Sequence, residues 1–253
     1  MAAAMEPDVQ MGPPVTTVVP LEPGQEQGSL QVFGQAVPGS GSPSVAVGAC
    51  PYSQRVYMML EERMLAFVVT CIDEEEMPTW LTEIKKDPEL PALRDGDEYI
   101  FGADDINEHV NERYRKESAP FIVPEELRGV CENLISALVE TFEQWMTSKS
   151  KEGPGRKEYE EAVANLDKHL KENGPYMYGR FHTDADFKLA PLLHHARVTL
   201  LRVMDFELPK SFKAVNEYLQ LAEGRASFQK YDRPEEEIVS IWSKKFGLSA
   251  QSG

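Results

Sequence analysis

The sequence predicts two parts of different fold class, an α/β domain followed by an all-helical domain. From Leu30 to Tyr114, short apolar runs alternate with helical patterns in the order strand, helix, strand, helix, hairpin and helix. From Glu125 onward, apolar residues recur at helical spacings of three and four. The length of 253 residues suffices for two cores of modest size.

The α/β domain is expected to span residues 29–114. Its first strands are expected at residues 30–33 and 66–72, and its helices at 53–64, 78–86 and 105–114. Asp95-Gly96 lies between two short apolar runs, which predicts a hairpin. Leu90-Pro91, just before that hairpin, is a place where a cis peptide can occur. This order of elements is typical of a thioredoxin-like domain.

The segment Cys50-Pro51-Tyr52-Ser53 lies where the first loop gives way to the first helix. Unpaired N–H groups and the helix dipole at that end favour a thiolate, so we expect Cys50 to be a nucleophile with a lowered pKa. Pro51 fits the first helical position. Ser53 occupies the place of the second cysteine in a dithiol motif, so the chemistry expected is that of a single thiol. A buried structural cysteine is the alternative.

Composition disfavours several classes of partner. The net charge is −16, from 26 basic and 42 acidic residues, which disfavours nucleic acid and anionic membrane surfaces. No apolar run reaches the length that spans a bilayer. Cys50, Cys71 and Cys131 are too widely spaced for a disulfide framework or a zinc cluster. His194 and His195 are adjacent and cannot share a metal as an i, i+4 pair would, so no metal is expected.

The two ends of the first domain are expected to be irregular. Residues 1–28 are rich in Pro, Gly and Gln without periodicity, which predicts a disordered tail. Acidic residues precede Arg55, the first arginine, which is unlike a transit peptide and favours a cytoplasmic location. Residues 115–124 are expected to be a linker.

The helical domain is expected to span residues 125–253. An apolar stripe runs from Leu127 to Trp145 and includes Cys131, which predicts a core cysteine. A second helix is expected at residues 159–171. Thr183 and Asp186 have the spacing of a capping box at the start of a third helix.

Five segments, in order along residues 30–246, carry a resemblance to a known family. They are Cys50-Pro51-Tyr52-Ser53-Gln54-Arg55-Val56, Leu90-Pro91-Ala92-Leu93, Asn173-Gly174-Pro175-Tyr176, Asp186-Phe187-Lys188-Leu189-Ala190-Pro191 and Ser227-Phe228-Gln229-Lys230. These segments resemble the plant and algal dehydroascorbate reductases, a branch of the glutathione transferase superfamily. The Gly-Pro-Tyr and Leu-Ala-Pro pieces point to this branch, whereas Cys-Pro-Tyr-Ser alone would also suit omega-class transferases or glutaredoxins.

The resemblance implies the glutathione transferase architecture and a monomer, as in the plant branch. It implies reduction of dehydroascorbate by Cys50 through a mixed disulfide with glutathione, which is a co-substrate, with no bound cofactor. Ser53 would donate a hydrogen bond to the thiolate, or alternatively cap the helix. Glutathione is expected against Leu90, Pro91, Ala103 and Asp104, and the second substrate against Pro51, Tyr52 and His195. For His195, a buried histidine with a backbone partner is the alternative.

The chain departs from the family pattern around residue 102. The superfamily usually has Glu-Ser or Asp-Ser there, which binds the γ-glutamyl end of glutathione, whereas this chain has Gly102-Ala103-Asp104. We expect Asp104 to supply the carboxylate, with a role as N-cap of the following helix as the alternative. The plant enzymes also carry an Asp before the cysteine and a Lys in the first strand, where this chain has Ala49 and Gln35.

Two other functions fit the same residues. An omega-type glutathione transferase or thiol transferase would keep the reactive cysteine and differ in the shape of its pocket. A non-enzymatic, chloride-channel-like member would keep the fold without turnover.

Overall fold

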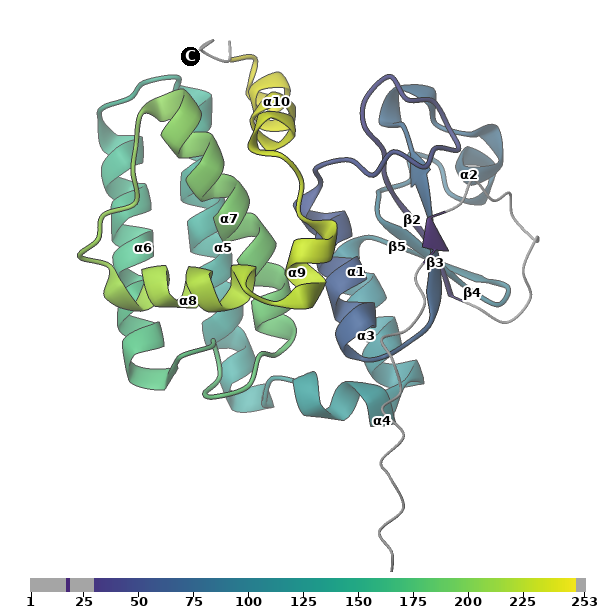
Figure 1. The fold of residues 1–253 in the computed structure, drawn as a ribbon, viewed down its shortest axis with the longest axis horizontal. Coiled ribbons are helices and arrows are strands. Elements are labelled where there is room, and N and C mark those ends of the chain that lie inside the picture. The colour runs from purple at the N-terminus through teal and green to yellow at the C-terminus, as the bar shows by residue number, and fades with distance from the viewer. Residues whose placement is uncertain (1–16, 19–29, 249–253) are drawn as a thin grey trace, which may run out of the picture.

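The computed structural model describes residues 17–18 and 30–248, and these form an α/β domain beside a helical domain (Figure 1). The sheet has the strand order β1-β3-β2-β4-β5. Its strands are β1 (Thr17–Val18), β2 (Leu30–Gln35), β3 (Phe67–Ile72), β4 (Ala92–Asp95) and β5 (Glu98–Phe101). Strands β1 and β2 pair parallel to β3, while β4 is antiparallel to both β2 and β5.

Strand β1 falls within residues 1–28, which were expected to contain no strand. Thr17 and Val18 pair with Val68 and Val69 on the free edge of β3, and an unpaired strand edge offers backbone partners to any extended segment. The expectation of a wholly irregular tail is therefore wrong at these two residues. The rest of that tail lies outside the described residues.

Helices cover both faces of the sheet. They are α1 (Pro51–Glu62), the 3₁₀ turn η1 (Glu74–Glu76), α2 (Thr79–Ile84) and α3 (Ala103–Arg113). Alternation along β2 directs Val32 into the core shared with α1 and α3, and Phe33 into a smaller cluster with Leu81 of α2. In Figure 1, α1 and α3 lie between the sheet and the helical domain.

The hairpin and the cis peptide are both present. Asp95-Gly96 joins β4 to β5 with Gly96 at φ 62°, and the Leu90–Pro91 bond is cis. Helix α3, however, begins at Ala103, two residues before the expected start at residue 105. Gly102 makes this possible, because its φ of 91° turns the chain directly from β5 into the helix.

The second part of the chain is helical, as expected. Its elements are α4 (Arg115–Ser118), η2 (Ala119–Phe121), α5 (Glu125–Ser148), α6 (Pro154–Asn173), α7 (Asp184–Met204), α8 (Lys213–Glu223), α9 (Ala226–Tyr231) and α10 (Glu235–Phe246). The first seven residues of the expected linker at 115–124 thus form helical turns, because Arg63 of the α/β domain packs against them through Ser118. Cys131 is buried in the core on α5, as predicted.

Helix α7 is the buried centre of this domain and carries the predicted capping box. The Thr183 N–H donates to Asp186 Oδ2 at 2.7 Å, and the Asp186 N–H bonds back to Thr183. Helix α7 packs against α1, α5, α8 and α10. It therefore links the α/β domain to the C-terminal helix α10.

Buried polar contacts join the two domains. Arg63, at the end of α1, has a fully buried side chain and pairs with Asp184 of α7 at 2.5 Å. Nearby, Glu62 accepts a bidentate contact from Arg225, with N–O distances of 2.7 and 2.9 Å. These contacts fix how α1 sits on the helical domain, and Cys50 is the N-cap residue that precedes α1.

Candidate active site

Cys50 lies at the interface of the two domains, as the N-cap residue of α1. It lines a cavity of about 540 Å³, and its exposed fraction is 7%. One wall comes from the α/β domain and includes Pro51, Tyr52 and Leu90. The opposite wall comes from α10 and includes Trp242 and Lys244. Cys50 therefore lines an open cleft large enough for a small organic substrate.

The expectation of a lowered pKa for Cys50 is wrong. Burial raises the pKa of this thiol, and the charge of Glu74 acts in the same direction. The Ser53 hydroxyl and the backbone N–H groups of Ser53 and Tyr52 act to lower the pKa, but they do not outweigh the loss of water. The helix N-terminus thus acts in the expected direction, and burial reverses the net shift of the pKa.

Cys50 still differs from the other two cysteines. Burial raises the pKa of Cys71 to about 12 and that of Cys131 to about 11. Neither has the helix N–H groups that face Cys50. Among the three, Cys50 alone combines a cavity at the domain interface with groups that stabilise a thiolate.

Ser53 is fully buried directly behind the thiol. Its Oγ accepts a hydrogen bond from the Gln35 N–H on β2 at 3.1 Å, so its own proton is available to the Cys50 sulfur, and the hydroxyl lowers the pKa of Cys50. The donor of this hydrogen bond is therefore an N–H of strand β2 and not an N–H at the start of a helix. The alternative of Ser53 as a helix cap is not what the structure shows.

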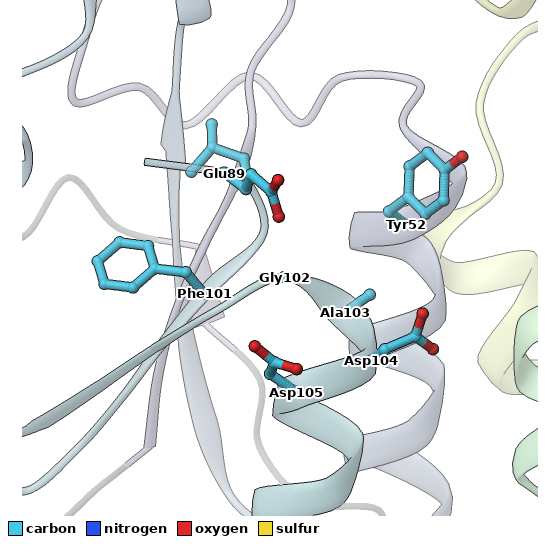
Figure 2. A pocket seen from close by; sticks show the side chains of 8 residues that line it. Tyr52, Glu89, Phe101, Gly102, Ala103, Asp104 and Asp105 are labelled. Atoms are coloured by element: carbon cyan, nitrogen blue, oxygen red, sulfur yellow. The ribbon is translucent and has the colours of Figure 1, made fainter. Parts of the chain in front are cut away.

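A second, smaller cavity of about 330 Å³ adjoins the first (Figure 2). Tyr52 and Leu90 line both cavities, so the two adjoin at these residues, while Cys50 lines the larger one. The remaining lining residues come from the segment before Pro91 and from the start of α3; they are Glu89, Phe101, Gly102, Ala103, Asp104 and Asp105. Among the described residues, the main-chain N–H and C=O of Leu90 have no hydrogen-bond partner.

Asp104 lines this second cavity, but its carboxylate is already paired. Arg55 lies 2.6 Å from Oδ1, and the Lys188 Nζ lies 2.9 and 3.0 Å from the two oxygens. Burial acts to raise the pKa of Asp104, but the two cations outweigh it and the pKa is lowered. The alternative role as N-cap is wrong, because Gly102 is the N-cap of α3.

His195 does not line the cavity that contains Cys50. It is 1% exposed on α7, and its Nδ1 accepts a hydrogen bond from Trp242 Nε1 at 3.1 Å. Burial lowers the pKa of His195 to about 3, so the ring is neutral. Its place is behind Trp242, which is the actual wall residue, and its partner is that side chain and not the backbone.

Comparison with known proteins connects this geometry to a family. The N-terminal domain of glutathione S-transferases matches residues 49–113. The protein named "Probable glutathione S-transferase DHAR4" from Arabidopsis thaliana is 32% identical over 214 residues, which are 83% of this chain and 95% of that protein. The chain belongs to the dehydroascorbate reductase branch of the glutathione transferase superfamily. It is thus an enzyme of that superfamily, and the non-enzymatic alternative falls away.

Two further members of the branch extend the match. "Probable glutathione S-transferase DHAR1, cytosolic" from rice is 29% identical over 79% of this chain and 91% of its own length. The crystal structure of the Chlamydomonas reinhardtii dehydroascorbate reductase matches with a TM-score of 0.70 and 25% identity. The aligned region covers 85% of this chain and 98% of the algal chain. The expected glutathione transferase architecture is thus confirmed.

Two negative findings apply to the described part of this reductase-family chain. Residues 17–18 and 30–248 contain no group of three His, Cys, Asp or Glu side chains that could hold a metal. Within the same residues, every helix is too short or too polar to cross a membrane.

The sequence did not identify Glu89, Trp242 or Lys244 as site residues of this family member. Trp242 and Lys244 lie on α10, almost 200 residues after Cys50. The packing of α10 against α7 and the ion pair between Lys244 and Glu75 bring them to the cavity that Cys50 lines. The adjacent Trp-x-Lys-Lys pattern in an amphipathic helix gives no local signal of that position. In the sequence, nothing distinguishes Glu89 from the other acidic residues of this acidic chain.

Proposed function

We propose that this enzyme reduces dehydroascorbate to ascorbate with two molecules of glutathione, through Cys50. The observation that supports it best is the adjacency of two cavities that share Tyr52 and Leu90, with Cys50 lining the larger one next to Tyr52 in the chain. A tripeptide thiol in the smaller cavity and a small oxidised substrate in the larger one would both reach the same sulfur. Membership of the dehydroascorbate reductase branch supports the assignment of these two substrates.

Glutathione is proposed to bind along the segment that contains Leu90. The free N–H and C=O of Leu90 can pair with the cysteinyl unit, as an extended peptide pairs with an open sheet edge. Pro91 holds this segment in place, because its C=O accepts from the Gly102 N–H at 2.9 Å. The first N–H groups of α3, at Ala103 and Asp104, have no intrahelical partner and favour a carboxylate of the γ-glutamyl end.

The second substrate is proposed to lie in the larger cavity, between Pro51 and Tyr52 on one side and Trp242 on the other. Aromatic and proline faces suit the flat ring of a small lactone. His195 contributes by orienting Trp242 through the hydrogen bond to Nε1.

The proposed cycle has three balanced steps. The Cys50 thiolate transfers two electrons to dehydroascorbate and, with one water, gives a sulfenic acid at Cys50 and the ascorbate anion. The first glutathione attacks the sulfenic sulfur, forms the mixed disulfide and releases water. The second glutathione attacks the mixed disulfide, which returns the Cys50 thiol and releases glutathione disulfide.

Because burial raises the pKa of Cys50, the thiol is the resting form at neutral pH. The hydroxyl of Ser53 is proposed to stabilise the thiolate once it forms, through a charge-assisted hydrogen bond. A cytoplasmic monomer is proposed for the enzyme in the cell; the rice relative whose name includes "cytosolic" supports that compartment.

The test is a glutathione-dependent assay of ascorbate formation with purified wild type and Cys50→Ser. We expect turnover in the wild type and none in Cys50→Ser, together with a glutathione adduct on Cys50 by mass spectrometry of the trapped wild type. Cys131→Ala is the matched control, expected to retain turnover and to lose about 1–2 kcal/mol of stability. Turnover by Cys50→Ser within a few-fold of wild type would exclude this mechanism.

A further inference from the structure

The smaller cavity has an unpaired carboxylate where residue 102 has no side chain. An ideal Cβ built on Gly102 would lie 3.3 Å from Glu89 Oε2. In Figure 2, the carboxylate of Glu89 is directed toward Gly102 at the start of α3. Glu89 makes no hydrogen bond or ion pair with any other residue that the structure describes. Its carboxylate is therefore free to bind a ligand group at the place that a side chain on residue 102 would otherwise fill.

We propose that Glu89 binds the α-ammonium group of glutathione and selects for thiols that carry it. This inference rests on the proposed function, because it assigns one residue of the same glutathione site. Glutathione has a single cationic group and two carboxylates, so a carboxylate in its site has one favourable partner. A charge-assisted hydrogen bond between the two is the contact expected.

Asp104 is a poorer partner for that ammonium group, although it lines the same cavity. Arg55 and Lys188 both pair with its carboxylate, so an arriving ammonium would compete with two fixed cations. In Figure 2, Asp104 projects from α3 toward α1, away from Glu89. We therefore assign to Glu89 the contact that the sequence assigned to Asp104.

Asp105 is the remaining carboxylate of the cavity. It lies in the first turn of α3, where an acidic side chain already interacts favourably with the positive end of the helix. Among the residues that line this cavity, none is Lys, Arg or His. The local charge thus favours a cationic group between Glu89 and α3. Neither Glu89 nor Asp105 has an ion-pair partner among the described residues, and Glu89 is the one whose carboxylate approaches the empty side-chain position of Gly102.

The test measures binding without thiol chemistry. S-methylglutathione and its N-acetyl derivative differ only in the ammonium group, and calorimetry gives the dissociation constant of each. For the wild type we expect S-methylglutathione to bind about tenfold more tightly than the N-acetyl form. In Glu89→Gln this preference should fall to near unity, through weaker binding of S-methylglutathione alone. Glu83→Gln, an exposed acid on α2, is the control for loss of charge and should behave as wild type.

Two results with the variants would overturn the assignment. One is an unchanged preference in Glu89→Gln; the other is loss of the preference in Asp105→Asn with Glu89→Gln unaffected. Failure of the proposed function is visible separately, in the ascorbate assay. If the wild type forms no ascorbate yet shows the Glu89-dependent preference, the reaction is wrong and the ammonium site stands. If it forms ascorbate but binds both ligands equally, only the role of Glu89 is wrong. Thermal midpoints of the variants, expected to match the wild type, exclude misfolding.

Discussion

At the scale of single residues, Cys50 shows how two opposing effects act on one sulfur. The helix start supplies N–H groups that favour the thiolate, while burial removes the water that would stabilise it. The net result is a raised pKa. A thiol with a raised pKa is protected from unselective oxidation at neutral pH, because thiolate content controls that reaction.

Alkylation kinetics test this balance. For the wild type, the pH midpoint of Cys50 alkylation should lie above the value of about 8.5 for a free cysteine, since burial dominates. Ser53→Ala should move the midpoint further up, because the hydroxyl is one of the groups that lower the pKa. A wild-type midpoint below the free value, or a downward shift in Ser53→Ala, would contradict the balance described here.

Residues of the site differ in how far the sequence could reveal them. The place of Cys50, Tyr52 and Leu90 along the cavities agrees with the sequence, because each belongs to a short motif whose geometry is local. We propose Glu89 in place of Asp104 because Arg55 and Lys188 pair with Asp104 from other helices, and Lys188 lies 84 residues away. Such long-range pairing is decided by tertiary packing, which the local pattern does not contain.

At the scale of elements, Arg63 is the polar contact that holds α1, α3, α4 and α7 together. Its guanidinium donates to Asn111, Ser118 and Asp184. Burial lowers the pKa of Arg63, and Asp184 acts in the opposite direction. The ion pair is thus enclosed, and its loss leaves Asp184 without its cation.

Arg63→Met should lower the free energy of unfolding by about 3 kcal/mol, because one partner of a buried pair is removed while the other remains. Urea denaturation measures this change. Arg202→Met is the matched control, since Arg202 forms an exposed pair with Glu235 at 3.8 Å and should cost under about 0.5 kcal/mol. Equal losses in the two variants would mean that the Arg63 contact does not organise the domain interface.

Helix α7 contains two buried histidines, His194 and His195, whose contributions to stability change in opposite directions with pH. Burial acts to lower the pKa of His194, but Asp232 and Glu223 outweigh it and raise the pKa. Its stabilising contribution is therefore full below about 6.5, the unfolded value, and is lost as pH rises through the folded value. His195 has a folded pKa of about 3, so its contribution is full above about 6.5 and is lost as pH falls.

The variant His195→Asn tests the contribution of His195 to the pH dependence of stability. Asparagine keeps an acceptor for Trp242 Nε1 but does not titrate. Between pH 7 and pH 5, the wild type should lose more unfolding free energy than His195→Asn, with the difference measured by urea denaturation at each pH. A variant whose stability falls as steeply as that of the wild type would show that His195 does not resist protonation.

Most elements were predictable because their signals are local. The Asp-Gly hairpin, the Thr183–Asp186 capping box and the apolar stripe of α5 each follow from spacing within one segment. Strand β1 and the helical turns at 115–121 were not predictable, since one depends on the open edge of β3 and the other on Arg63. The start of α3 was misplaced because the positive φ of Gly102 is a property of the folded turn.

At the scale of the whole molecule, the net charge of −16 opposes the approach of an anionic thiol. Glutathione carries a net negative charge at neutral pH, so screening should help it bind. We expect kcat/KM for glutathione to increase with ionic strength between low salt and about 0.15 M, where the screening length falls to about 8 Å. With 2-mercaptoethanol, a neutral thiol, the rate should not depend on salt. A decrease for glutathione would point to a local positive field that dominates the net charge.

Gly102 also limits how this chain can exchange sequence with its relatives over evolution. An L residue there would adopt φ near 91° at a cost of about 1 kcal/mol or more, and its Cβ would lie 3.3 Å from Glu89 Oε2. An acid at position 102 would add like charges to that crowding. We expect substitutions at positions 89 and 102 to be non-additive, because an acid at position 102 would crowd the Glu89 carboxylate and repel its charge. If evolution moves the acid from position 89 to position 102 one substitution at a time, the intermediate protein has either both acids or neither.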